Sequence, residues 1–235
     1  MREIQIYENA DNLCAEMVEA MIATSTFDPV HIALSGGSTP TLLFEKMTEY
    51  DDPDVLRNIH FYWVDERHVP EDDPESNYGV FRRLLVDTGI VPKENVHPIK
   101  YHPDIHQMAA NYEQELRQLV PFMDDLPVFD EIILGVGEDG HTASIFPDRL
   151  DLFETTDIVA TTRHPVTGQG RVTLTGSTIN NAYEVAVLCL GKRKRRILDE
   201  VLRENKPEYP ISHVDLRLRS TVVFKLDFAA SCYGA

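Results

Sequence analysis

The sequence is poor in cysteine, has no long apolar run and carries no excess of positive charge. Its three cysteines, Cys14, Cys189 and Cys232, are odd in number and far apart, without the spacing of metal ligands, so we expect a reduced chain. The first residues alternate polar and apolar side chains and contain no continuous apolar core, which argues against a secretory signal peptide. No apolar run approaches the roughly 20 residues that a membrane span needs. These absences predict a cytoplasmic protein with no membrane partner.

The charge balance is strongly acidic. The chain has 39 Asp and Glu residues against 22 Lys and Arg residues, a net charge of −17. Such a protein repels nucleic-acid backbones and anionic lipid surfaces unless its basic groups cluster locally. We therefore predict no nucleic-acid partner. A small anionic substrate requires a pocket whose own cations override the field of the whole molecule.

Length and composition indicate one globular domain. The 235 residues include 43% hydrophobic and 26% charged side chains, as in ordinary globular proteins, and can bury a core without disulfides or metals. No repeat, low-complexity tract or long Pro/Gly/Ser linker divides the chain, so the predicted domain spans residues 1–235.

Short apolar runs alternate with segments of helical spacing. The predicted strands cover residues 2–7, 30–34, 59–64, 129–134, 158–162, 171–174, 183–190 and 221–226. The predicted helices cover residues 13–21, 38–47, 78–85, 108–119 and 191–202. This alternation predicts an α/β fold with a largely parallel sheet covered on both faces.

Three polar segments begin where predicted strands end, at residues 35–39, 65–68 and 137–141. In parallel α/β sheets, ligands bind at the carboxyl ends of the strands, near the point where the strand order reverses. We expect the fold to bring these segments to one edge of the sheet. This convergence is the main indication of function.

Ser35, Gly36, Gly37, Ser38 and Thr39 join a predicted strand to a helix N-terminus. Glycines let the backbone approach a ligand, and the free N–H groups and dipole of a helix start favour a phosphate. The segment lacks the Walker lysine and the G-x-G-x-x-G pattern. A tight turn with an ordinary N-cap explains it equally well.

Asp65, Glu66, Arg67 and His68 follow an apolar strand. Ionisable side chains at the end of a buried strand are costly unless they pair or act on a ligand. In one interpretation an Asp–Arg pair closes the strand. In the other, Arg67 is a fixed cation beside a substrate oxygen, and Asp65, Glu66 and Asn77 are further candidates for substrate contacts.

Residues 135–144 contain several glycines at a strand end and display Asp139 and His141. Imidazole titrates near neutral pH, so a histidine here is suited to take a proton from water and return it to a leaving group. A nearby carboxylate would orient the ring. The alternative is a loop histidine that only stabilises the turn.

Arg171 begins a predicted strand, and residues 192–196 place five cations at the start of the last helix. Cations at a helix N-terminus oppose the helix dipole, so a bound anion would explain them, although a solvated face is the other interpretation. Lys194, with Lys192 as the second choice, is the lysine expected to reach a site.

Two other kinds of site are not predicted. His97, His102 and His106 lie close together, but His102 precedes a proline and is biased out of helical geometry, so we predict no zinc site. There is also no G-x-S-x-G nucleophile elbow.

The sequence resembles the 6-phosphogluconolactonases. The motifs that carry the resemblance are residues 34–40, 65–67, 76–77, 135–144, 171–175, 179–182, 191–194 and 227–230, in the order seen in that family. The resemblance covers nearly the whole chain. It implies a Rossmann-like α/β/α sandwich, hydrolysis of 6-phospho-D-glucono-1,5-lactone in the pentose phosphate pathway, and no metal, cofactor or covalent intermediate. We expect a monomer or a weak homodimer.

The resemblance also implies roles for the residues. His141 would activate water and protonate the departing ring oxygen, Arg67 with backbone N–H groups would stabilise the carbonyl oxygen, and Asp139 would orient the site. The expected phosphate contacts are Ser35, Gly36, Gly37, Ser38, Thr39, Arg171 and Lys194.

Two alternatives remain open. Glucosamine-6-phosphate deaminases share the fold and the Asp-Gly-His turn but carry an acidic residue shortly after the histidine, where this sequence has Phe146. A sugar-phosphate-binding regulator would have kept the fold and lost catalysis. The sequence also departs from the lactonases at Phe224, which they often replace with Trp, and at residues 164–170, where they have a Pro- and Lys-containing loop.

Overall fold

The computed structural model describes residues 2–50, 54–204, 206–215 and 221–231, so Cys232 lies outside the described residues. Its main sheet has seven strands in the order β1-β12-β11-β8-β2-β3-β5, and every neighbouring pair is parallel. The strands are β1 (Arg2–Tyr7), β2 (Val30–Leu34), β3 (Ile59–Trp63), β5 (Val96–His97), β8 (Glu131–Gly135), β11 (Glu184–Cys189) and β12 (Thr221–Asp227). The parallel sheet predicted from the alternation is confirmed.

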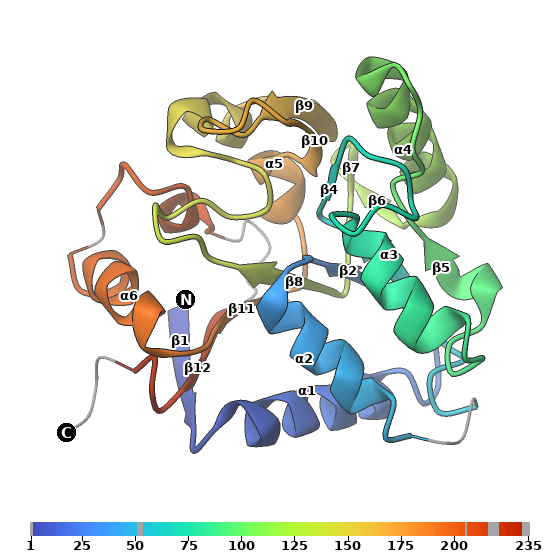
Figure 1. Cartoon of the computed structure of the whole chain (residues 1–235), viewed down its shortest axis with the longest axis horizontal. Coiled ribbons are helices and arrows are strands. Elements are labelled where there is room, and N and C mark those ends of the chain that lie inside the picture. The colour runs from blue at the N-terminus through green and yellow to red at the C-terminus, as the bar shows by residue number, and fades with distance from the viewer. Residues whose placement is uncertain (1, 51–53, 205, 216–220, 232–235) are drawn as a thin grey trace.

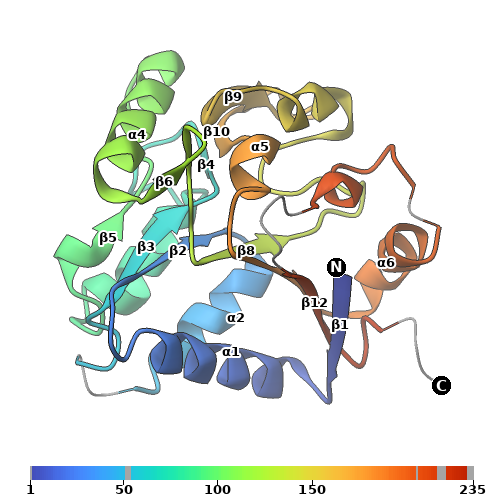
Figure 2. The same ribbon diagram turned by 180° about the vertical axis from the view of Figure 1, so that it is seen from behind.

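Helices cover both faces of this sheet (Figure 1; Figure 2 from behind). Helices α1 (Ala10–Thr24) and α2 (Ser38–Met47) pack together on one side, and α5 (Gly176–Ile179) lies on the other. The remaining helices are α3 (Asn77–Phe81), α4 (Ile105–Leu119) and α6 (Arg195–Leu202). The short π or 3-10 segments are η1 (Arg82–Val86), η2 (Lys93–Asn95), η3 (Pro147–Phe153), η4 (Lys192–Lys194) and η5 (Pro210–His213).

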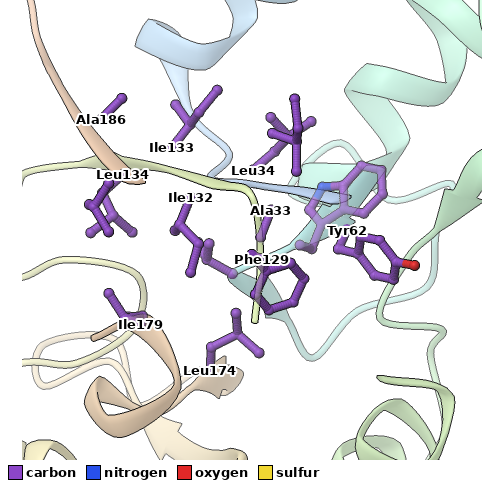
Figure 3. Packing of buried hydrophobic residues seen from close by; sticks show 14 of the residues in the cluster. Ala33, Leu34, Tyr62, Phe129, Ile132, Ile133, Leu134, Leu174, Ile179 and Ala186 are labelled. Carbon is purple, nitrogen blue, oxygen red and sulfur yellow. The ribbon is translucent and has the colours of Figure 1, made fainter. Parts of the chain in front are cut away.

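The core is built on strands whose two faces are both apolar. In β8, Ile133 points toward α2, whereas Ile132 and Leu134 point to the opposite face, toward Leu174 and Ile179 (Figure 3). Successive strand residues face opposite ways, so a strand covered on both sides is apolar throughout. No helix within the described ranges is both long enough and apolar enough to cross a bilayer.

The direction of strand order reverses between β2 and β8. From β2 the chain adds β3 and β5 on one side, and from β8 it adds β11 and β12 on the other. The connections that leave β2 and β8 therefore turn away from each other and open a crevice at the carboxyl ends of these strands. The segments at 35–39 and 136–144 flank this crevice.

The structure contains a second sheet that the sequence did not predict. Strands β4 (Asp65–Arg67), β10 (Gly170–Leu174) and β9 (Val159–Arg163) form an antiparallel sheet in that order. The strands expected at 158–162 and 171–174 exist, but they lie outside the parallel sheet. The polar segment after β3 is itself a strand, because its backbone pairs with β10.

Smaller differences concern helix boundaries and one hairpin. The helix expected over 191–202 begins with the 3-10 turn η4, and the one over 78–85 divides into α3 and η1. Strands β6 (Phe122–Met123) and β7 (Leu126–Pro127) form a two-residue hairpin. Its turn residues, Asp124 and Asp125, both have positive φ, as a type I′ turn requires.

Candidate active site

The crevice between β2 and β8 contains a pocket of about 310 Å³. Eleven of the residues singled out from the sequence line it: Ser35, Gly36, Gly37, Ser38, Thr39, Asp65, Arg67, Asn77, His141, Arg171 and Lys194. They come from the turns after β2 and β8, from the first residues of α2 and α3, from the small antiparallel sheet and from η4. The predicted convergence of the three polar segments is therefore present in the structure.

His141 lines the pocket, and Asp139, which does not line it, is hydrogen-bonded to the His141 ring. The His141 Nδ1 and Asp139 Oδ1 atoms are 2.5 Å apart, and the His141 backbone N–H also points at Oδ1, at 3.2 Å. Burial alone would raise the pKa of Asp139, but the hydrogen bond and charge of the His141 ring lower it to about 2. The ionised carboxylate accepts the Nδ1 hydrogen, so in the neutral ring Nε2 carries a free lone pair.

The turn after β8 is shaped for this pair. A Cβ atom at Gly137 would lie 2.1 Å from His141 Nδ1 and 2.5 Å from Asp139 Oδ1, so only glycine leaves room for the two side chains. The Gly137 N–H donates to the His141 carbonyl oxygen at 2.8 Å and closes the turn. A short closed turn thus fixes the ring at the pocket wall.

The N-terminus of α2 forms another wall. Among the described residues, no side chain caps this helix, and its first turn contains no acidic residue. Its N-cap, Gly37, has φ of +99°. Gly36 lies so close to Asn77 that a Cβ atom would be 1.9 Å from Asn77 Oδ1. Free backbone N–H groups at the start of a helix favour an anion, and this one faces the pocket.

Arg67 and Arg171 lie directly opposite each other in the antiparallel pair of β4 and β10. Opposite residues of such a pair point to the same face, so the register brings two guanidinium-bearing side chains together. Burial, and then the charge of Arg67, lower the pKa of Arg171. An anion between the two groups would relieve their repulsion.

Each of these arginines is tied to a loop. Arg67 Nη1 donates to the Glu75 carbonyl oxygen at 2.6 Å, and Arg171 Nη1 donates to Gln169 Oε1. Gln169 Nε2 in turn donates to Glu75 Oε2 at 2.8 Å. The Arg67 Nε atom is buried without a hydrogen-bond partner within the described part of the chain. The guanidinium groups are held in place while part of their donor capacity stays unused.

Lys194 is the lysine that reaches the pocket. Its Nζ donates to the Val136 carbonyl oxygen at 2.5 Å, which anchors the cation beside the turn after β8. Lys192 lies in the same 3-10 turn but does not line the pocket. The cation run at 192–196 therefore contributes one member to the site.

Glu66 was a candidate for substrate contacts, but it does not line the pocket. Its carboxylate is buried and accepts hydrogen bonds from Ser76 Oγ and from the backbone N–H groups of Asn77 and Tyr78, at 2.8–3.0 Å. Burial raises the pKa of Glu66, and the hydrogen bonds from the backbone N–H groups of Tyr78, Asn77 and Arg67 oppose this rise. Because the carboxylate satisfies the N-terminus of α3, we assign it to the helix cap and not to substrate. Asp65, in contrast, lines the pocket and accepts from Ser144 Oγ at 2.6 Å.

Two aromatic pocket residues were not singled out as site residues from the sequence. The Phe146 ring lies 5.1 Å from the His141 ring and 5.3 Å from the His164 ring. His164 belongs to the connection between β9 and β10. The only sequence signal for it was the departure of residues 164–170 from the lactonase pattern. In the ranges that the structure covers, no group of three or more His, Cys, Asp or Glu side chains is arranged to hold a metal ion.

The chain is similar to known proteins both in sequence and in structure. The family model described as "Glucosamine-6-phosphate isomerases/6-phosphogluconolactonase" matches residues 3–223. The 6-phosphogluconolactonase of Haemophilus influenzae is 40% identical over 201 residues, which cover 83% of this chain and 84% of that protein. The crystal structure of devB protein aligns with a TM-score of 0.93 at 34% identity over 100% of both chains. The structure of 6-phosphogluconolactonase from Thermotoga maritima aligns at 0.83 and 30% identity, over 97% of this chain and 100% of that one.

Proposed function

Because the chain belongs to the glucosamine-6-phosphate isomerase/6-phosphogluconolactonase family, we propose that it is a 6-phosphogluconolactonase. It hydrolyses 6-phospho-D-glucono-1,5-lactone to 6-phospho-D-gluconate in the oxidative pentose phosphate pathway. The observation that carries this proposal is the pocket itself. One wall presents His141, whose ring is hydrogen-bonded to Asp139, and another presents the anion-favouring start of α2 with Arg171 and Lys194.

The chemical step follows from the His141–Asp139 geometry. The free Nε2 lone pair takes a proton from water, and the water oxygen forms a bond to C1 of the lactone. The C1 carbonyl oxygen then carries negative charge, which Arg67 and nearby backbone N–H groups stabilise. When the bond between C1 and the ring oxygen breaks, the imidazolium returns its proton to that oxygen. Asp139 keeps Nδ1 protonated and stabilises the imidazolium.

The phosphate contacts position the lactone for this step. The substrate phosphate binds the free N–H groups of residues 36–39, with Arg171 and Lys194 as counter-charges. Binding energy from a remote group can hold the carbonyl close to the base, which contributes to the rate through orientation. These local cations also offset the repulsion between an anionic substrate and a chain of net charge −17.

The related deaminase activity fits this pocket less well. Phe146 is buried, packs against the His141 ring and has no group that transfers a proton. A deaminase of this family uses an acidic residue near this position to open the sugar ring, and a lactone needs no such step. The side chain that is present therefore favours lactone hydrolysis.

We further propose that the protein acts in the cytoplasm as a monomer or a weak homodimer, with a phosphosugar lactone as its partner. Cys14 and Cys189 are free and buried, which suits a reducing compartment. Burial raises the pKa of the Cys14 thiol to about 11, so this thiol is unreactive at neutral pH.

One pair of assays on the purified protein tests the proposed activity. We expect rapid hydrolysis of 6-phospho-D-glucono-1,5-lactone above its spontaneous rate, and no ammonia from glucosamine 6-phosphate. Ammonia release without lactone hydrolysis would indicate a deaminase. Binding of both phosphosugars without turnover of either would indicate a non-catalytic sugar-phosphate-binding protein.

A further inference from the structure

The connection between β9 and β10 holds a pocket residue to which the reaction described above gives no role. His164 lines the pocket. Its Nδ1 accepts hydrogen bonds from the backbone N–H groups of Val166 and Thr167, at 3.2 and 3.3 Å. A nitrogen that accepts from two N–H groups carries no hydrogen, so the neutral ring has its hydrogen on Nε2. His164 is therefore fixed as a hydrogen-bond donor.

The same contacts disfavour His164 as a second base. To accept a proton from water, Nε2 would need the other tautomer, in which Nδ1–H would point at the Val166 and Thr167 N–H groups. That tautomer would lose both hydrogen bonds to the loop. The loop thus selects a donor at Nε2, whereas Asp139 selects an acceptor at Nε2 of His141.

The register of the hairpin places His164 near the arginines. Arg171 lies opposite Thr162, and the ladder continues one step beyond the strand ends, where the His164 N–H donates to the Gln169 carbonyl oxygen at 2.9 Å. Residues two apart in a strand share a face, so His164 stands diagonal to Arg171 on one face. Arg67 lies on that face too, opposite Arg171.

We propose that His164 is a substrate-binding residue whose Nε2–H donates to the phosphate group beside Arg171. The proposal rests on the proposed lactonase function. A ligand oxygen next to Arg171 is best matched by an anionic group, and a phosphate oxygen accepts a neutral N–H as well as a guanidinium N–H. This contact gives the enzyme part of its preference for a phosphorylated lactone over the same lactone without phosphate.

Two substitutions separate this donor from the loop contacts. In His164→Asn, the side-chain oxygen takes the place of Nδ1 and can accept from Val166 and Thr167, but no donor reaches the position of Nε2. In His164→Gln, the longer amide places an N–H near that position and loses the short loop contacts. His106→Asn, on α4 and away from the pocket lining, makes the same chemical change and serves as the control.

The readout is kcat/KM for 6-phospho-D-glucono-1,5-lactone divided by kcat/KM for D-glucono-1,5-lactone. We expect His164→Asn to lower this ratio about tenfold, the effect of losing one hydrogen bond to a charged group. The ratio should stay within about twofold of the unsubstituted protein in His164→Gln and in His106→Asn. An unchanged ratio in His164→Asn would overturn the proposal, and so would an equal loss in the Asn and Gln variants.

Calorimetry with inorganic phosphate distinguishes failure of this proposal from failure of the proposed function. If the unsubstituted protein hydrolyses neither lactone, the proposed function is wrong. Phosphate binding about tenfold weaker in His164→Asn would then still support His164 as an anion-binding residue. Equal phosphate affinity in the two proteins would contradict it.

Discussion

Two sets of histidines in this protein differ in what their rings contact. At the pocket, His141 meets a carboxylate, at 2.5 Å. On the β2-β3-β5 side of the sheet, the rings of His31, His60 and His97 stack at 5.4 Å, and His60 Nδ1 lies 3.1 Å from His97 Nε2. His97 Nδ1 also lies 3.6 Å from Glu115 Oε1. An ionised partner favours a protonated ring, whereas a neighbouring imidazole and burial oppose it, so the contrast with His141 holds for His31 and His60.

The pKa directions of the stacked histidines agree with this comparison. Burial lowers the pKa of His31 and His60. The charge of Asp130 opposes this shift at His31, and neighbouring histidines lower both pKa values further. These rings are held neutral and serve packing and hydrogen bonding, as in the contact between His31 Nδ1 and the Tyr62 hydroxyl at 3.1 Å. Histidine thus has a structural role in one region and, by our proposal, acts as a general base in the other.

Removing the base should give the largest effect. We expect His141→Ala to lower kcat for the phosphorylated lactone by roughly 10²–10⁴-fold, because general-base catalysis contributes about that much. The proposed phosphate cradle consists of the backbone N–H groups of residues 36–39 with Arg171 and Lys194. Because this substitution leaves the cradle intact, the affinity for inorganic phosphate should stay within about twofold. His60→Ala is the matched control and should keep the wild-type kcat. Wild-type turnover by His141→Ala would remove His141 from the mechanism.

The second-largest effect should come from filling the space beside the His141–Asp139 pair. In Gly137→Ala, the new Cβ would collide with the His141 ring, so the ring must move away from its position at the pocket wall. Misplacing a catalytic group by about 1 Å can cost about 10²-fold in rate, so we expect kcat to fall by 10- to 100-fold. Gly135→Ala meets nothing within 4 Å and should cost little. Equal kcat values for the two variants would show that the turn does not position the ring.

The phosphate cradle is tested by two neighbouring lysines. We expect Lys194→Ala to raise KM for the phosphorylated lactone about tenfold with a smaller change in kcat, because it removes a charge-assisted contact made before the reaction. Lys192→Ala, in the same helical turn but outside the pocket lining, should leave KM unchanged. A KM that responds equally to both substitutions would mean that general surface charge, and not the pocket, recruits the substrate.

The stacked histidines should reveal themselves in stability and not in turnover. The pKa values of His31 and His60 are lowered in the folded protein, so below the ordinary value of about 6.5 the unfolded chain binds more protons and stability falls. We expect Tm to drop by a few degrees between pH 7 and pH 5, and by less in His60→Gln. Thermal melts across this range measure it, with His106→Gln, on α4, as control. An identical pH dependence in His60→Gln would contradict the assignment.

Most of the parallel sheet and its site edge could be predicted, because both depend on local patterns. Buried strands are continuously apolar, so their ends are visible where Ser35 and Asp65 begin polar segments. The glycines around His141 similarly mark a turn within a few residues. The relation of sequence to structure is direct wherever the interacting groups are close along the chain.

What could not be predicted depends on contacts between distant segments. Arg171 pairs with Arg67 from more than a hundred residues away, so nothing near either arginine indicates the small antiparallel sheet. Glu66 looked like a substrate contact because the α3 N-terminus that it caps lies ten residues further on. The donor role of His164 depends on a loop conformation that its residue types do not specify.

The central claim is that His141 and the phosphate cradle face each other across one pocket. A crystal structure of the protein with 6-phospho-D-gluconate bound tests it most directly. The account predicts the phosphate at the N-terminus of α2, in contact with Arg171 and Lys194, and the C1 carboxylate within hydrogen-bonding distance of His141 Nε2. A phosphate bound elsewhere, or a carboxylate directed away from His141, would contradict it.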